Sequence, residues 1–288
     1  MSQGPVILPG VYDAVTAKAA ARAGAKGLYL SGAGVTNSQL GVPDIGLITL
    51  TEMARQAAYV CEASGLPVLS DADTGFGEVH NVARTVREME RVGIAGVHLE
   101  DQENPKRCGH LEGKHVVEPQ DMVRKLRAAI QTRADRDFLI VARTDARAVE
   151  GLASAIDRAK RYVDAGADAV FPEALETEAE FAAFRQAVDV PLLANMTEFG
   201  KTPLISAARF AHLGYDVVIF PLTAFRVMLK AVTEAYDELM RHGTQAGLID
   251  RMWTRRDIYD LLAYKTYEEL DRGWAEGTDG DATSEETK

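Results

Sequence analysis

Eight short apolar runs alternate with longer Ala-rich segments of helical periodicity from the start of the chain to about residue 240. Short apolar runs are typical of buried strands, and strands that alternate with amphipathic helices are typical of a parallel sheet. The expected strands are 6–9, 27–30, 67–70, 95–99, 138–142, 169–171, 191–194 and 217–220. Eight strand–helix units fit a closed barrel better than an open sheet, so we predict an α/β fold of the TIM type, (β/α)8.

The segments between these runs predict the surrounding helices and the domain organisation. Gly24, Gly93 and Gly166 follow three Ala-rich segments, and we expect them to end helices in the left-handed conformation. A further helical block covers about 244–272. We therefore predict a single barrel domain, 1–272, with a C-terminal helical extension. The acidic, polar residues 273–288 have almost nothing to bury and predict a disordered tail.

Charge and cysteine content limit the function classes. The chain has 288 residues, of which 47% are hydrophobic, and this length buries a large core without disulfides. Its net charge of −11 argues against a nucleic acid or an anionic membrane as partner, and an anionic substrate would need a local positive site. There are two cysteines, no basic and apolar leader, and no apolar run long enough for a membrane span. We expect a cytoplasmic protein.

Polar residues follow six consecutive predicted strands. In a TIM-type barrel the carboxyl ends of the strands open onto one face, where catalytic groups lie. Loops are polar in any protein, but repeated carboxylate, guanidinium and amide groups at these positions favour an active site. The residues are Ser31 to Gly34, Asp71, Asp73, Glu100, Asp101, Arg143, Asp145, Glu173, Asn195 and Thr197.

Three of these carboxylates predict a metal site. Asp71 and Asp73 stand two residues apart, so in an extended chain their side chains point the same way, and Glu100 ends the next strand. Any one of them could instead cap a helix or form a salt bridge. Three neighbouring carboxylates repel one another unless a cation lies between them, and hard oxygen ligands favour magnesium or manganese over zinc.

A second cluster surrounds one of the two cysteines. Lys106, Arg107, Cys108 and His110 crowd a Gly-containing loop after the fourth strand. Cations and an imidazole beside a thiol stabilise its thiolate, which favours a reactive, catalytic cysteine. Cys61 lies in a helical segment and is expected to be an inert core residue.

The run "SGAGVTN" follows the second strand. It contains Gly-x-Gly, but Asn37 stands where a dinucleotide fingerprint has its third glycine and no helix is expected to open directly, so a nucleotide-binding module is weakly supported. The alternative is a turn whose backbone N–H groups approach a carboxylate. His98 lies inside an apolar strand and is expected to be a hydrogen-bonded core residue.

Three segments carry a resemblance to a known family. "PKRCGH" at 105–110, "DADTGFG" at 71–77 and "YLSGAGV" at 29–35 resemble the isocitrate lyase and phosphoenolpyruvate mutase superfamily, and within it the methylisocitrate lyases. The similarity extends to "VARTDA", "FPEA", "ANMTEFG", "PLTAFR" and "TR" at 254–255. Two departures are Ala33, where close relatives have glycine, and "LEGK" at 111–114, which is partly similar to isocitrate lyases.

The resemblance implies a magnesium-dependent carbon–carbon lyase of propionate catabolism, which cleaves 2-methylisocitrate to pyruvate and succinate by retro-aldol type chemistry. Isocitrate lyase, dimethylmalate lyase, and an oxaloacetate or other α-keto acid decarboxylase are the alternatives. A decarboxylase would need no acid at Cys108. One methyl group changes transition-state binding by only about 1–3 kcal/mol, so the sequence leaves the choice of substrate open.

The resemblance also implies roles for individual residues. Magnesium would be bound by Asp71, with its waters held by Asp44, Asp73 and Glu100. The groups that bind the substrate would be Ser31, Gly32, Ala33, Cys108, Gly109, Arg143, Glu173, Asn195, Thr197, Arg226 and Arg255.

The reaction assigns a task to each catalytic group. Tyr29 or a metal-bound carboxylate would take the hydroxyl proton, and the sequence does not choose between them. Arg143, His110 and Asn195 would stabilise the succinyl aci-anion, and Lys106 would add positive charge at the cysteine loop. Cys108 would deliver the proton to carbon, beneath a loop, 104–114, that closes over the substrate. The resemblance further implies a homotetramer with the C-terminal helices packed between subunits.

Overall fold

The computed structural model describes residues 4–278. The chain divides into two compact units, 1–229 and 230–288. Residues 273–278, expected in the tail, form the end of a helix instead, and the other tail residues lie outside the described part.

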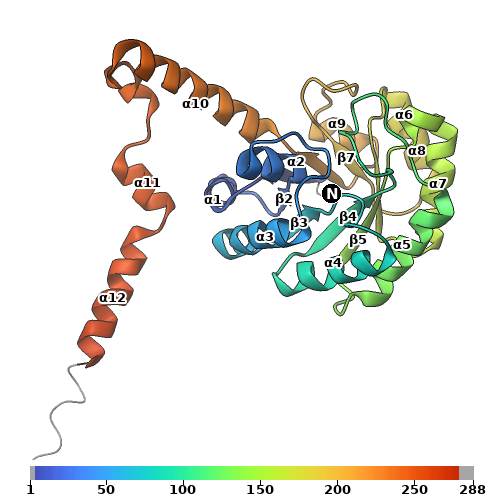
Figure 1. Cartoon of the computed structure of the whole chain (residues 1–288), viewed down its shortest axis with the longest axis horizontal. Helices are drawn as coiled ribbons and strands as arrows, with labels where there is room; N and C mark the ends of the chain where they lie inside the picture. The colour runs from blue at the N-terminus through green and yellow to red at the C-terminus, as the bar shows by residue number, and fades with distance from the viewer. Residues whose placement is uncertain (1–3, 279–288) are drawn as a thin grey trace, which may run out of the picture. The chain divides into compact units, whose positions relative to one another are not determined.

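Eight parallel strands form the barrel of the first unit, which confirms the predicted fold and all eight strands to within two residues (Figure 1). They are β1 (Val6–Val11), β2 (Leu28–Leu30), β3 (Val68–Asp71), β4 (Gly96–Glu100), β5 (Leu139–Thr144), β6 (Ala169–Pro172), β7 (Leu193–Asn195) and β8 (Val217–Phe220). The hydrogen-bonded order is β6-β5-β4-β3-β2-β1-β8-β7, so the first and last strands pair. A single parallel bridge, Val170 to Leu192, joins the remaining edges at the β6–β7 seam.

Helices lie on the outside of the strands (Figure 1). They are α1 (Ala14–Arg22), α2 (Gly32–Val35), α3 (Leu50–Ser64), α4 (Val79–Arg91), α5 (Pro119–Thr132), α6 (Arg147–Glu150), α7 (Leu152–Asp164), α8 (Glu178–Ala187), α9 (Ala207–His212) and the start of α10 (Thr223–His242). Gly24, Gly93 and Gly166 follow α1, α4 and α7 with φ of 91°, 90° and 105°, the left-handed conformation that we expected.

The first unit buries apolar side chains in two layers. Between helices and strands, large clusters bury residues such as Met89, Leu126 and Phe184. Inside the barrel a smaller cluster fills the space between the strands, and it comprises Leu8, Tyr29, Leu69, Val141, Phe171, Leu193 and Ile219. This inner layer is a floor, so polar groups at the carboxyl ends of the strands lie above packed side chains.

The second unit is helical, as predicted for this part of the chain. It contains the end of α10, a short 3-10 helix η2 (Ala246–Arg251), α11 (Arg255–Leu261) and α12 (Tyr264–Thr278). Thr254 caps α11, because its hydroxyl accepts a hydrogen bond from the amide of Asp257. Within residues 4–278, no helix combines the length and apolar composition that crossing a bilayer requires.

Candidate active site

One cavity of about 60 Å³ gathers most of the predicted site residues at the carboxyl ends of the strands. Its predicted members are Tyr29, Ser31, Ala33, Asp44, Asp71, Lys106, Cys108, Gly109, His110, Arg143, Glu173, Asn195 and Thr197. Arg107, Phe171, Ile219, Pro221 and Leu222 complete the lining. A larger open depression of about 740 Å³ borders Asp73 but contains neither Cys108 nor Arg143. The small cavity therefore holds the reactive groups.

The "SGAGVTN" segment does open a helix, contrary to our expectation. The Ser31 hydroxyl caps α2 by accepting the N–H of Gly34 at 3.1 Å, and the π-helical turn 36–40 follows. Gly32 permits this close approach, since a Cβ there would lie 2.5 Å from a carboxylate oxygen of Asp71. The start of α2 is thereby held directly beside Asp71.

The acidic group is organised around a lysine. Lys106 Nζ lies 2.5 Å from Oδ1 of both Asp44 and Asp73. Asp73 is not in extended chain as we expected: β3 ends at Asp71, and Asp73 turns with φ of 46° so that its N–H donates to Asp71 Oδ1 at 2.9 Å. The turn, rather than strand alternation, brings the carboxylates together.

Burial and neighbouring charge shift the pKa values of these acids in opposite directions. Burial raises the pKa of Asp73 to about 6, despite the opposing attraction of Lys106. Burial would also raise the pKa of Asp71, but His98, Lys106 and Arg143 outweigh it and hold that pKa below its ordinary value. Of these two acids, Asp71 is therefore the one kept ionised.

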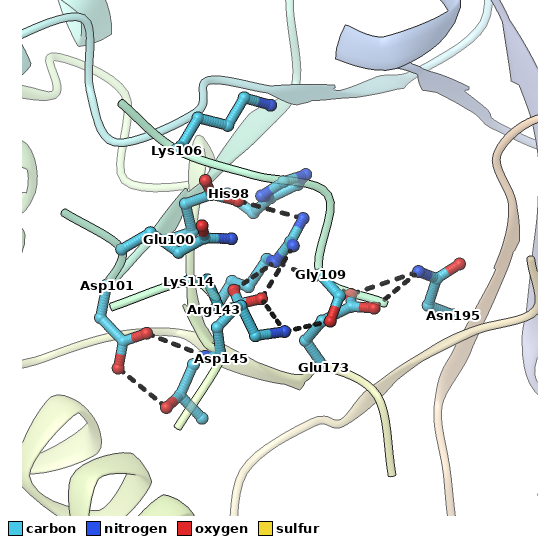
Figure 2. Close-up of polar contacts among 12 residues, drawn as sticks. His98, Glu100, Asp101, Lys106, Gly109, Lys114, Arg143, Asp145, Glu173 and Asn195 are labelled. Carbon is cyan, nitrogen blue, oxygen red and sulfur yellow. Dashed lines mark hydrogen bonds and ion pairs between the residues drawn. The ribbon is translucent and has the colours of Figure 1, made fainter. Parts of the chain in front are cut away.

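Arg143 lies at the centre of a second, fully buried group of charges (Figure 2). Its Nε lies 2.9 Å from Oδ2 of Asp145, and its Nη1 lies 3.2 Å from Oε2 of Glu100. Glu173 Oε2 lies 3.7 Å from Arg143 Nε, and it accepts a hydrogen bond from the side-chain amide of Asn195 at 3.2 Å. Burial raises the pKa of Glu173, but Arg143 and His110 outweigh it, so that pKa falls well below its usual range.

Tyr29 and His98 form a pair beneath Asp71. The Tyr29 hydroxyl lies 2.9 Å from His98 Nε2, which lies 3.5 Å from Asp71 Oδ1. His98 is thus hydrogen-bonded in the core as expected, but it also positions two site residues. Burial lowers the pKa of His98 to about 4. Burial and Asp71 raise the pKa of Tyr29 well above 10, so this phenol is protonated in the absence of bound cations.

The cysteine loop covers the cavity but does not stabilise a thiolate, which corrects our expectation for Cys108. Lys106 is paired with carboxylates, and His110 Nε2 lies 2.7 Å from Glu173 Oε1, so both groups are occupied elsewhere. Partial desolvation by the surrounding groups raises the pKa of the Cys108 thiol, although the residue keeps an exposed surface. A protonated thiol suits a proton donor rather than a nucleophile. Cys61 also has a raised pKa, about 11, through burial.

The carboxylates of the site can accommodate a divalent cation that retains several coordinated water molecules. Both carboxylate oxygens of Glu100 are buried without a hydrogen bond, so this acid has unused acceptor capacity. Within residues 4–278 no three His, Cys, Asp or Glu side chains form a group that could hold a metal ion by themselves. Mg²⁺ is commonly bound by one or two carboxylates and several waters, and this arrangement fits such an ion.

Several predicted residues lie outside the cavity lining, and others were missed. Glu100 and Asp73 stand behind it, while Arg226 pairs with Glu198 at 3.3 Å and is 41% exposed. Arg255 begins α11 in the second unit. Sequence reasoning gave no role to Lys114, whose side chain is only 2% exposed. The one available signal was its place in the same loop as Cys108.

The sequence and the fold both match known proteins. The family model for phosphoenolpyruvate phosphomutase matches residues 1–240. A 2-methylisocitrate lyase from Aeropyrum pernix is 53% identical over 92% of this chain and 85% of its own. The structure of a 2,3-dimethylmalate lyase, a PEP mutase/isocitrate lyase superfamily member, has a TM-score of 0.89 at 35% identity, covering 99% of this chain and 94% of that one.

A more distant structure contains a metal. A phosphonopyruvate hydrolase in complex with oxalate and Mg²⁺ superposes with a TM-score of 0.84 at 27% identity, covering 93% of each chain. The predicted resemblance is confirmed. This chain belongs to the phosphoenolpyruvate mutase and isocitrate lyase superfamily, as a carbon–carbon lyase of the methylisocitrate lyase type.

Proposed function

We propose that the substrate is 2-methylisocitrate, which the enzyme cleaves to pyruvate and succinate. The observation that carries this proposal is the shared cavity, in which Asp71, Arg143 and the Cys108 thiol line one small space. A carboxylate-rich substrate needs cationic groups in a chain of net charge −11, and Arg143 and Lys106 provide them there. The Aeropyrum relative, a 2-methylisocitrate lyase at 53% identity, supports this substrate.

Magnesium is the proposed cofactor, and manganese would substitute for it. Asp71 would bind it, with Asp44, Asp73 and Glu100 holding its waters. When bound, the ion would polarise the substrate hydroxyl and the neighbouring carboxylate, as a Lewis acid does. The unused acceptor oxygens of Glu100 support a cation at this place.

The chain's own groups would then carry the proton transfers. A base, either Tyr29 or an acidic side chain, takes the hydroxyl proton of the substrate. The C2–C3 bond breaks, its electron pair passes to the succinyl half as an aci-anion, and pyruvate forms. Ser31, Gly32 and Ala33 bind a carboxylate at the start of α2, and Arg143, His110 and Asn195 stabilise the developing charge. Glu173 and Thr197 bind the substrate beside these groups, and Arg226 provides a further cation for a substrate carboxylate.

Cys108 completes the reaction by donating its proton to the succinyl carbon, and the thiol is then reprotonated by the proton released at the hydroxyl. The raised pKa of this thiol supports the role, since a donor must be protonated before it acts. Its position in the exposed loop 104–114, above the cavity, supports a loop that opens for substrate and closes for chemistry.

Keto-acid release from a panel of substrates tests the proposal. With Mg²⁺, 2-methylisocitrate should give the highest kcat/KM, and isocitrate, which lacks one methyl group, should be about 10–200-fold lower. 2,3-Dimethylmalate, which has a methyl group in place of a carboxymethyl group, should also be slower because it offers one carboxylate fewer to the cationic groups of the site. A chelator should abolish turnover and added Mg²⁺ should restore it. Faster turnover of oxaloacetate, with no dependence on Cys108, would instead favour the decarboxylase.

We further propose a cytoplasmic homotetramer that serves propionate catabolism. Two free thiols support the location. Apolar side chains of the C-terminal helices support the assembly, since Tyr236, Met240 and Tyr267 are 64%, 87% and 69% exposed. Sedimentation should give four times the monomer mass of 31.3 kDa, and a monomer would refute the assembly.

A further inference from the structure

Lys114 makes the most unusual buried contact of the cysteine loop. Its side chain is 2% exposed, and its ammonium group contacts the Gly109 carbonyl oxygen and lies 3.3 Å from Asp145 Oδ1 (Figure 2). A buried ammonium is costly unless both charge and hydrogen bonds are satisfied, so these two partners define its position. The lysine therefore connects the loop that carries Cys108 to the end of β5.

The loop 104–114 is held by inward-pointing side chains on an otherwise exposed segment. Lys106 pairs with Asp44 and Asp73, and His110 pairs with Glu173. Lys114 is the third such side chain, and its carboxylate partner, Asp145, follows the end of β5. Cys108 lies between the first two in sequence, so its position depends on how the whole loop is fastened.

The Gly109 peptide shows how Lys114 acts on its neighbour. A Cβ at Gly109 would lie 2.4 Å from Glu173 Cγ and 2.7 Å from Arg143 Nη2, so this backbone packs directly on two site residues. The ammonium of Lys114 accepts no hydrogen bond and can only donate, which fixes the direction of the Gly109 carbonyl. Turning that peptide would turn the adjoining Cys108.

Asp145 is a firm anchor for this contact. Its backbone N–H donates to Asp101 Oδ1 at 2.8 Å, and Asp101 also accepts the Tyr162 hydroxyl at 2.8 Å. Arg143 shares the same carboxylate, with Nη2 3.2 Å from Oδ1. Lys114 thus joins the loop 104–114, which opens and closes in the proposed mechanism, to the end of β5. Its own side chain lies outside the cavity lining.

We propose that Lys114 is a positioning residue of the reaction, which fixes the Gly109 carbonyl against Asp145 and so holds Cys108 over the cavity. This inference rests on the proposed role of Cys108 in the lyase reaction. A displacement of about 1 Å at a reacting group can lower the rate about 100-fold. Because Lys114 touches no cavity surface, its loss should lower kcat much more than it changes KM.

The test compares Lys114→Met with the wild-type enzyme in the full chain. We expect kcat for 2-methylisocitrate to fall about 10–100-fold, with KM changed less than about threefold. Alkylation of Cys108 by iodoacetamide, followed by mass spectrometry to separate it from Cys61, should become at least severalfold faster in the unliganded enzyme. Pyruvate plus succinate should protect Cys108 in the wild type but not in the variant.

Arg133→Met is the matched control, because Arg133 is a half-buried cation that pairs with Asp168 at the opposite end of the barrel. It should leave both Cys108 alkylation and kcat unchanged. If Lys114→Met does not fold, Lys114→Ala, which also removes the donor to the Gly109 carbonyl, is judged by the same criteria. Wild-type alkylation rates in a folded Lys114 variant would overturn the inference, whatever its melting temperature. Alkylation does not depend on turnover, so this failure is distinct from a wild-type enzyme that cleaves no substrate of the panel.

Discussion

The two ends of the barrel use the same charged residue types in opposite ways. Where strands begin, two carboxylates have matched donors: Asp168 accepts from Arg133 and from the amide of Ile140, and Asp216 accepts from the amide of Leu192. Where strands end, Asp101 and Asp145 are paired in the same way, but both Glu100 oxygens are buried without a hydrogen bond, and the nearest cation is Arg143, 3.2 Å from Oε2. Satisfied pairs stabilise the fold, whereas unsatisfied acids retain capacity for a ligand.

The largest expected effect lies at the strand ends. Cys108→Ser should lower kcat by about 100-fold or more, the usual contribution of a positioned acid, because a hydroxyl is a far weaker proton donor. Its exposed side chain makes the free energy of unfolding change by less than about 0.5 kcal/mol. Steady-state kinetics and urea unfolding measure the two quantities. Cys61→Ser should retain kcat, and near-normal turnover by Cys108→Ser would remove the proton-donor role.

The second effect concerns metal binding and stability together. Mg²⁺ at about 100 times its Kd should stabilise the wild type by about 2.7 kcal/mol and raise its Tm by roughly 5 °C. Asp71→Asn should lose this shift, because its neutral side chain cannot replace the charged ligand. Asp168→Asn, at the other end, should lower the starting Tm yet keep the shift. Calorimetry with and without Mg²⁺ gives the answer, and a full shift in Asp71→Asn would contradict the assigned site.

The smallest effect is confined to the strand beginnings. Arg133→Met removes the partner of Asp168 and a donor to the Phe138 carbonyl. We expect a loss of about 1–3 kcal/mol in the free energy of unfolding, because a half-buried carboxylate is left with fewer donors. The value of kcat should stay within twofold of the wild type. A large fall in kcat would show that the two ends are not separate in function.

The architecture was predictable because its signal is local and repeated. Each strand is a short apolar run, and glycines such as Gly24 and Gly166 mark helix ends through a conformation that other residues avoid. The strand ends could be predicted as a group because parallel strands share one face. The boundary of the tail had no comparable signal, and α12 continues to Thr278 where polar composition favoured disorder.

Pairing within the site could not be predicted, because it depends on distances between loops. Lys106, Arg107 and His110 are neighbours of Cys108 in sequence, yet the structure turns Lys106 and His110 toward carboxylates from other strands. The expected thiolate stabilisation failed for that reason. Lys114 was missed because a single lysine after a glycine has no distinctive pattern, although its burial sets it apart at once.

The seam between β6 and β7 is the place where local opening of the barrel should be easiest. One backbone bridge joins these strands, whereas β4 and β5 pair along five residues. Just above that bridge, Asn195 and Glu173 link the two strands through their side chains, and both line the cavity. Local opening is easiest where the fewest main-chain bonds must break. The wall of the cavity at this seam is therefore held mainly by side chains, and a substitution of Asn195 or Glu173 would loosen it more than the loss of a main-chain bond elsewhere in the barrel.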